Sequence, residues 1–153
     1  MLAKLKHFFA NPHVKLSDEE LAEHLNLAAA SLLLEVVMAD ESVSEQENKL
    51  LPELLTTTLN LSINDVETLI SDAKKSQEKS TSLYEFTQAI NDNFDVEQKQ
   101  QLILAMWQLA YADGHLCRYE DQIIRRTAEL LYLRHSELIQ MRNIAMEQLG
   151  KPS

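Results

Sequence analysis

Residues 39–47, ADESVSEQE, return 73 positions later as ADGHLCRYE at residues 112–120 (112 − 39 = 73). Both copies contain Ala-Asp, an aliphatic residue three positions after the Asp, and a Glu seven positions after it. Apolar residues at helical spacing lie on both sides of each copy. A polar corner that occurs twice between helices predicts an internal repeat, which we place at about residues 25–73 and 98–146.

Helical signals dominate the rest of the chain. Only two glycines and three prolines are present, and no alternating apolar pattern of useful length occurs, so we expect no sheet. Residues 2–9 have one apolar face, which predicts a short first helix, and the polar residues 74–82 are expected to form a linker. We therefore predict an all-α fold of seven to eight helices in two pseudo-symmetric halves. The residues expected to cap helices are Ser17, Ser44, Ser62 and Asp95.

Length and composition favour one domain over residues 1–153, in the cytoplasm. A chain of 153 residues can bury a core without disulfides, and Cys117 is its single cysteine. The net charge of −10 argues against nucleic acid as a partner, since phosphate binding needs a basic surface. The longest apolar run, residues 25–38, is shorter than a membrane span and is interrupted by Glu35, so we expect no direct membrane insertion.

Each corner has a structural interpretation that needs no ligand. The Asp would accept hydrogen bonds from N–H groups of the turn, and the aliphatic residue would pack into the core. The next polar residue would cap the following helix, and the Glu would fall in its first turn, where negative charge is favoured. The residues in these four roles are Asp40 and Asp113, Val43 and Leu116, Ser44 and Cys117, and Glu47 and Glu120.

A functional alternative is a site for a hard cation. Asp40, Glu47, Asp113 and Glu120 carry the carboxylate oxygens that Ca²⁺ and Mg²⁺ prefer. If a pseudo-two-fold axis brings the corners together, the four groups would share one acidic pocket. The spacing of an EF-hand loop is absent, so a cation would have to be held in another way.

Basic charge is concentrated late in the chain, because all five arginines lie from residue 118 onward. Arg118, Arg125 and Arg126 fall on one expected helix and are candidates for docking an acidic protein partner. The alternative is that these arginines form salt bridges within the fold, where an exposed pair contributes at most about 1 kcal/mol.

The doubled A-D-x-x-(V/L)-x-x-x-E phrase in an acidic helical chain resembles the TerB-like family, named for a tellurite-resistance protein. The likeness spans about residues 25–146, and Gly114 fits it better than Glu41, which replaces the family's usual Gly. A similar module opens a membrane-anchored J-domain co-chaperone, although this chain has neither a J domain nor a membrane helix. The resemblance implies about seven helices, a stress-linked role, divalent-cation binding at the four repeated carboxylates and no established enzymatic activity.

We therefore expect a non-enzymatic helical binding module in a stress-response or membrane-associated assembly, with a protein as its partner. The alternative is a protein that binds or senses a divalent cation, Ca²⁺ or another, through the repeated corners. No catalytic residues are proposed, because the five histidines lack metal-ligand spacing and no glycine-rich phosphate loop occurs. The sequence leaves the oligomeric state open.

Overall fold

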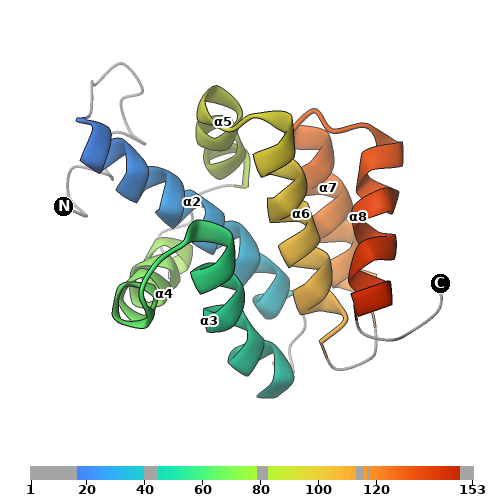
Figure 1. The fold of residues 1–153 in the computed structure, drawn as a ribbon, viewed down its shortest axis with the longest axis horizontal. Coiled ribbons are helices and arrows are strands. Elements are labelled where there is room, and N and C mark those ends of the chain that lie inside the picture. Colours follow the sequence, from blue (N-terminus) through green and yellow to red (C-terminus); the bar gives the residue numbers. More distant parts are fainter. Residues whose placement is uncertain (1–16, 40–44, 79–82, 113–115, 117, 149–153) are drawn as a thin grey trace.

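The computed structural model describes residues 17–39, 45–78, 83–112, 116 and 118–148, and within them it contains helices and no strand. The all-α prediction is confirmed. The predicted helix at residues 2–9 lies outside the described residues. Figure 1 shows the described helices, which are α2 (Asp18–Met38), α3 (Glu45–Leu59), α4 (Ile63–Glu78), α5 (Leu83–Asn93), α6 (Val96–Ala110), α7 (Arg118–Leu130) and α8 (His135–Gln148).

Three predicted helix starts are confirmed by their hydrogen bonds. The Glu20 N–H donates to Ser17 Oγ at 3.2 Å, and the Ser17 N–H donates to the Glu20 carboxylate at 3.3 Å, which completes a capping box for α2. Asp95 and Gln98 form the same reciprocal pair at the start of α6. Ser62 accepts the bond that starts α4. The fourth predicted cap, Ser44, lies outside the described residues.

The expected linker at residues 74–82 is wrong in its first part, because α4 continues to Glu78. Lys74 and Lys75 are exposed, so these turns of α4 need no apolar stripe. Lysine, glutamine and glutamate are good helix formers, and neither glycine nor proline stops the helix here. A prediction from apolar periodicity alone therefore placed the end of this helix too early.

Two long helices, α2 and α6, form the centre of the fold. Helix α2 contacts α3, α4, α5, α6 and α7, and α6 contacts α3, α7 and α8 as well as α2. In Figure 1, α2 runs between α5 above it and α3 and α4 below it, with α6, α7 and α8 gathered at its far end. Residues 27–34 of α2 and 102–107 of α6 are all buried, so these helices supply much of the core.

Helix α2 is longer than the apolar run that the sequence suggested. Its 21 residues are enough, by length and composition, to cross a membrane. Of the apolar stretch that meets this test, 61% is buried inside the fold. A core helix of a bundle has the same composition, because it too is surrounded by apolar side chains.

Contacts on the two sides of the fold correspond. The first corner lies between α2 and α3, and α4 is the next helix along the chain. The second corner lies between α6 and α7, and α8 is the next helix. Contact of α2 with α4 and α3 is matched by contact of α6 with α8 and α7. Contact of α2 with α7 is matched by contact of α6 with α3. The division into two repeated halves stays a prediction, and these paired contacts are what it would require.

Helices α3 and α7 also end in the same way. The Leu61 N–H donates to the Thr56 carbonyl at 3.3 Å, and the Leu133 N–H donates to the Ala128 carbonyl at 3.0 Å. Each closure includes a left-handed residue, Asn60 with φ 56° or Tyr132 with φ 60°. This is the geometry of a Schellman motif, which satisfies carbonyls at a helix end.

These closures reveal a shift in the spacing of the repeat. Asn60 and Tyr132 are 72 residues apart (132 − 60 = 72), and α4 and α8 begin at residues 63 and 135, also 72 apart. At this spacing Val66 would correspond to Leu138, and not to Ile139, which lies 73 residues after it (139 − 66 = 73). Val66 is fully buried and corresponds to the buried Leu138, whereas Ile139 is only half-buried.

Candidate functional site at the helix corners

The helix ends that border the two corners lie on the same side of the fold. In Figure 1, the C-terminal ends of α2 and α6 and the N-terminal ends of α3 and α7 all point toward the lower edge. Contacts of α6 with α2 and with α3 agree with this arrangement. The fold therefore meets one condition for a shared site, because the helix ends that border both corners lie on the same side.

Three of the four candidate carboxylates lie outside the described side chains. Asp40 and Asp113 lie outside the described residues, as does the predicted cap Cys117. Glu47 is in α3, but its side chain is outside the described part. Among the side chains that the structure describes, no group of three or more His, Cys, Asp and Glu could hold a metal ion. The four-carboxylate site thus stays a prediction.

Glu120 is the candidate carboxylate that the structure places. It is the third residue of α7 and only 1% exposed. It lies on the same face of the helix as the buried residues Ile124, Thr127 and Ala128. The unpaired N–H groups of a first turn favour a negative charge there. Glu120 is therefore part of the inner face of α7.

Leu116 behaves as the corner interpretation predicts. It lies just before α7 and is partly buried against the hydrophobic core. Burial of this aliphatic side chain ties the turn to the bundle, because removing apolar surface from water is favourable. The corresponding residue of the first corner, Val43, lies outside the described residues.

The three candidate arginines lie on the outward part of α7. Arg125 Nε donates to Asp121 Oδ2 at 2.9 Å, and Arg126 Nη1 lies 3.4 Å from Glu129 Oε2. Both pairs are within α7 and solvent-accessible, so each contributes little stability. Arg118 is exposed and stands seven residues before Arg125, which places the two on one side of the helix.

His24 was not singled out by the sequence and lies buried in α2. Burial lowers the pKa of its imidazole from 6.5 to about 4, because the charged form is poorly solvated there. The ring is therefore neutral at pH 7. No spacing pattern marks such a residue, since its burial depends on the helices around α2.

Glu137 was also missed, and it joins α8 to α6. Its carboxylate accepts the Arg134 N–H at 2.8 Å and the Gln100 amide at 2.7 Å. The backbone bond from Arg134, and after it the bond from Gln100, lower the pKa of Glu137 below its ordinary value of 4.5. A Glu at the third position of a helix is a capping signal, so the sequence could have suggested the bond from the Arg134 N–H. The bond from Gln100 joins residues that are 37 apart in sequence.

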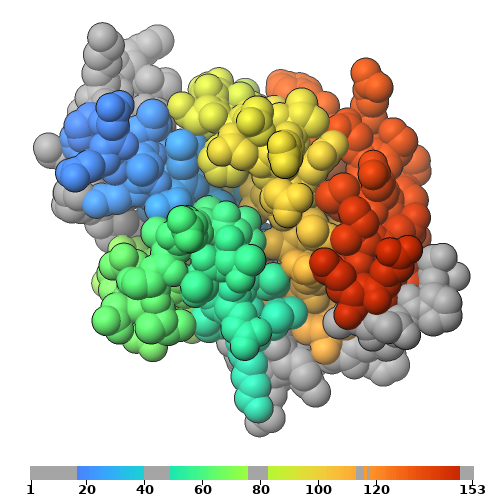
Figure 2. All heavy atoms as spheres, viewed as in Figure 1, coloured from blue at the N-terminus to red at the C-terminus, as the bar shows by residue number. Residues whose placement is uncertain are grey.

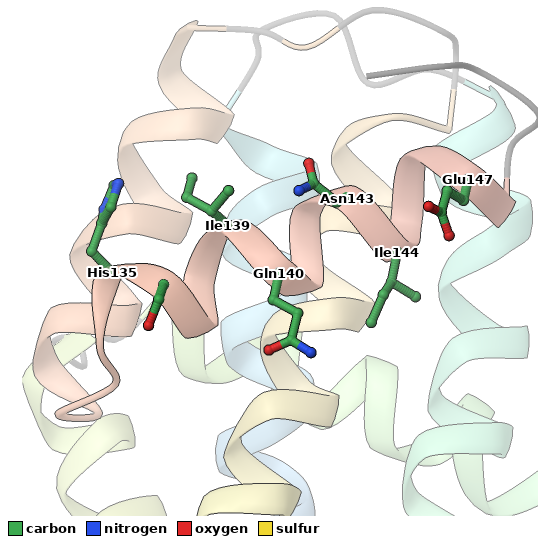
Figure 3. Close-up of a pocket in the computed structure, with 7 residues that line it drawn as sticks. His135, Ile139, Gln140, Asn143, Ile144 and Glu147 are labelled. Atoms are coloured by element: carbon green, nitrogen blue, oxygen red, sulfur yellow. The ribbon is translucent and has the colours of Figure 1, made fainter.

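A shallow groove of about 570 Å³ follows the outer side of α8. Ile139 and Ile144 supply its apolar parts, and Gln140, Asn143 and Glu147 supply polar groups (Figure 3). All the residues that line this groove come from α8, so in the described part of the chain it is one face of a single helix. None of the carboxylates or arginines selected from the sequence lines it.

Comparison with known proteins gives a family match. The family model described as tellurite resistance protein TerB matches residues 26–143, which is 118 of the 153 residues. The matched region begins in α2 and ends in α8, so it includes both corners. Neither the curated proteins nor the solved structures gave a match to this chain.

Proposed function

We propose, because this chain belongs to the tellurite resistance protein TerB family, that it is a helical binding module of a stress-response assembly. The module would act without catalysis, by docking an acidic protein on the outward side of α7. The name of the family supplies the link to tellurite stress. The arginines of α7 supply the candidate surface.

The observation that carries this proposal is the division of α7 into two faces. Ile124 and Ala128 are buried against the core, whereas Arg118 and Arg126 are exposed and Arg125 is partly exposed. Burial of one face fixes the helix, so the guanidinium groups are held on a rigid support. Arginine suits this role because its planar group can bind a carboxylate through two parallel hydrogen bonds.

The salt bridges within α7 are compatible with docking. Exposed pairs such as Arg125 with Asp121 contribute roughly 0.2–1 kcal/mol, so a partner's carboxylate could replace them at small cost. Interfaces are enriched in arginine, and truncation of a central arginine often weakens binding by 2 kcal/mol or more, about 30-fold.

Charge reversal tests the docking surface. A cell that lacks the gene would be complemented with the wild type or with Arg125→Glu plus Arg126→Glu, and growth would be measured across tellurite concentrations. The variant should fail to restore growth while its helical circular dichroism and melting temperature stay close to wild type. A matched control is Lys74→Glu with Lys75→Glu, which makes the same change of charge on exposed residues of α4.

Equal growth of cells with the arginine variant and the wild type would refute docking on α7. Equal loss of growth with the lysine control would show that overall charge matters and that the position of the arginines does not. Failure of the wild type to restore growth would refute the link to tellurite.

The second candidate function is binding of a divalent cation at the corners. The burial of Glu120 in the first turn of α7 and the common side of the two corners favour it. A carboxylate in such a position can lend oxygen atoms to a cation that the turn residues also contact. Asp40, Glu47 and Asp113 would complete the set.

Thermal melting with and without calcium tests the cation site. A ligand that binds only the folded state stabilises it by about 2.7 kcal/mol at a concentration 100 times its Kd, which raises the melting temperature. The rise should disappear in Asp40→Asn with Asp113→Asn, and persist in Asp65→Asn with Asp72→Asn, a matched pair in α4. No rise at millimolar calcium would exclude a functional site.

A further inference from the structure

An open groove lies along the contact of α3 with α6. It consists of two adjoining hollows, of about 410 and 390 Å³, that share Thr58 and Gln101. Leu54 and Leu102 lie in its walls, and α2 lines one end with Leu25. Figure 2 shows the surfaces of α3 and α6 meeting on the side that faces the viewer. The groove is long enough to be lined by residues from the start to the end of α6.

The corresponding place on the other side of the fold is covered. Contact of α3 with α6 corresponds to contact of α7 with α2, and there α5 packs against both helices. The Asn91 amide also donates to the Leu130 carbonyl at 2.7 Å, which fixes α5 to the end of α7. If the two halves are related, a second helix is expected on α3 and α6.

The start of the chain has the apolar spacing of α5. In α5, apolar side chains at positions i, i+3, i+6 and i+7 form one face, and three of the four are buried. The same spacing occurs 81 residues earlier. The two sets are Leu83, Phe86, Ala89 and Ile90 in α5, and Leu2, Leu5, Phe8 and Phe9 near the start of the chain.

Helix α5 and residues 2–9 also have similar positions relative to the helix that follows each of them. Helix α5 directly precedes the capping box of α6, and residues 2–9 precede the capping box of α2. Groove residue Leu25 stands eight residues after Ser17, about 12 Å along the helix at 1.5 Å per residue. Residues 10–16 can span about 23 Å when extended, so residues 2–9 can reach the groove.

Charge also favours the start of the chain as the segment that occupies the groove. The side chains that line the groove include the carboxylates of Glu53, Asp95 and Glu97 and no lysine or arginine. Residues 1–16 contain three lysines and no acidic residue, although the whole chain has a net charge of −10. Lys6 would take the place of the buried Thr87 of α5, and its long stem can carry the ammonium group out to the acidic rim.

We propose that residues 2–9 form a helix that docks in the α3–α6 groove, as α5 docks on α2 and α7. Leu2, Leu5, Phe8 and Phe9 would face the groove, and the lysines would lie near its carboxylates. The docked helix would complete the first half of the fold. This proposal is independent of any partner of α7 and of any cation at the corners.

A spin label on the full chain tests the proposal. Cys117→Ala removes the native thiol, and Ala3→Cys attaches a nitroxide at the place of Tyr84, which is 59% exposed in α5. The label should broaden the ¹⁵N-amide signals of residues 97–102 in α6 and 57–59 in α3, and leave those of α8 sharp. Adding Phe8→Ser with Phe9→Ser should abolish the broadening, whereas adding Asn11→Ser should not.

Unchanged chemical shifts in α8 will show that each variant is folded. Absence of broadening in α6 and α3, or broadening elsewhere alone, would overturn the proposal. So would broadening that persists when labelled ¹⁴N protein is mixed with unlabelled ¹⁵N protein, since a second copy would then fill the groove. Sedimentation with phosphatidylserine vesicles that depends on Phe8 and Phe9, without broadening, would indicate a membrane as the occupant instead.

Discussion

Helices α2 and α6 are the two central helices of the fold, and the side chains described around them differ. Helix α6 is joined to α8 by directional side-chain bonds in addition to apolar packing. These are Gln100 to Glu137 at 2.7 Å, Trp107 to the Leu138 carbonyl at 3.2 Å, and Arg142 to Tyr111, directly after α6, at 3.0 Å. Such bonds fix the position of α8 along α6.

Helix α2 is packed mainly through small and aliphatic side chains. Residues 28–30 are all alanine and at most 1% exposed, and Leu32 and Leu33 beside them are fully buried. Alanine lets neighbouring helices approach closely, since little side chain stands between the backbones. The comparison shows what to test: the bonds from α6 to α8 are directional, whereas the alanines of α2 contribute through close packing.

The largest expected effect comes from removing Trp107. This side chain is fully buried and donates to α8, so Trp107→Ala removes apolar contacts and the indole hydrogen bond to the Leu138 carbonyl. We expect a loss of about 3–5 kcal/mol in the free energy of unfolding, measured with urea. Trp107→Phe should lose less, because most of the apolar volume remains. A loss under 1 kcal/mol for alanine would contradict the central role of this residue.

A swap of Ala29 and Leu102 tests packing by shape. The two residues are 73 apart, are both buried, and line the same end of the groove (102 − 29 = 73). Ala29→Leu should destabilise by about 1–3 kcal/mol through overpacking, and Leu102→Ala by about 2–5 kcal/mol through a cavity. The double variant should recover at least about 0.5 kcal/mol of the summed loss if the side chains share a space.

Additive losses in this double-mutant cycle would show that the two sites pack independently. Ser71→Leu provides a control in α4, because Ser71 is exposed and added volume there meets little resistance. Its free energy of unfolding should change by less than about 0.5 kcal/mol.

As the pH falls, protonation of His24 in α2 should lower the free energy of unfolding before protonation of Glu137 affects the contact of α6 with α8. Burial lowers the pKa of His24 to about 4, so below pH 6.5 the unfolded state binds a proton that the folded state resists. Stability should fall by up to about 1.4 kcal/mol per pH unit between pH 6.5 and about 4. His24→Gln should flatten this slope in urea titrations from pH 7 to 5. An unchanged slope would contradict the assignment.

Glu137 resists protonation in the folded state, as His24 does, but it acts at lower pH. Its lowered pKa means that its stabilising effect is present above about pH 4.5 and is lost as the pH falls through the folded-state pKa. The interval from pH 6.5 to 5 therefore isolates the effect of His24.

The smallest expected effect distinguishes the ends of α3 and α7. Tyr132 has φ 60° and is 81% exposed, whereas the corresponding left-handed residue of α3 is asparagine, which tolerates this conformation. Tyr132→Gly should stabilise the fold by up to about 1 kcal/mol, because glycine adopts positive φ without strain. Asn60→Gly should change stability less, and a larger gain there would reverse the comparison.

Local signals in the sequence predicted most of the helices. Ser17, Ser62 and Asp95 were correctly identified as caps, because a cap depends on residues within one turn. The same local view failed at Lys74 and Lys75, where an exposed helix continues without an apolar stripe. A constant spacing of 73 residues also could not reveal that the left-handed residues after α3 and α7 are 72 residues apart.

The candidate site was predicted less completely. Leu116 packs against the core as expected, and the arginines of α7 lie on its outer part. The repeat marked Glu120, but only the fold shows that it belongs to the inner face of α7. The pKa of His24 and the bond from Gln100 to Glu137 depend on neighbours distant in sequence, which no short motif encodes.

By itself, the sequence determined the all-α class, the two corners and the starts of three helices, because spacing and capping act over a few residues. Tertiary structure alone decided that α2 and α6 form the centre, that Glu120 and His24 are buried, and that α5 packs against both α2 and α7. These features arise where helices far apart in the chain exclude water from one another, so they are properties of the packed fold.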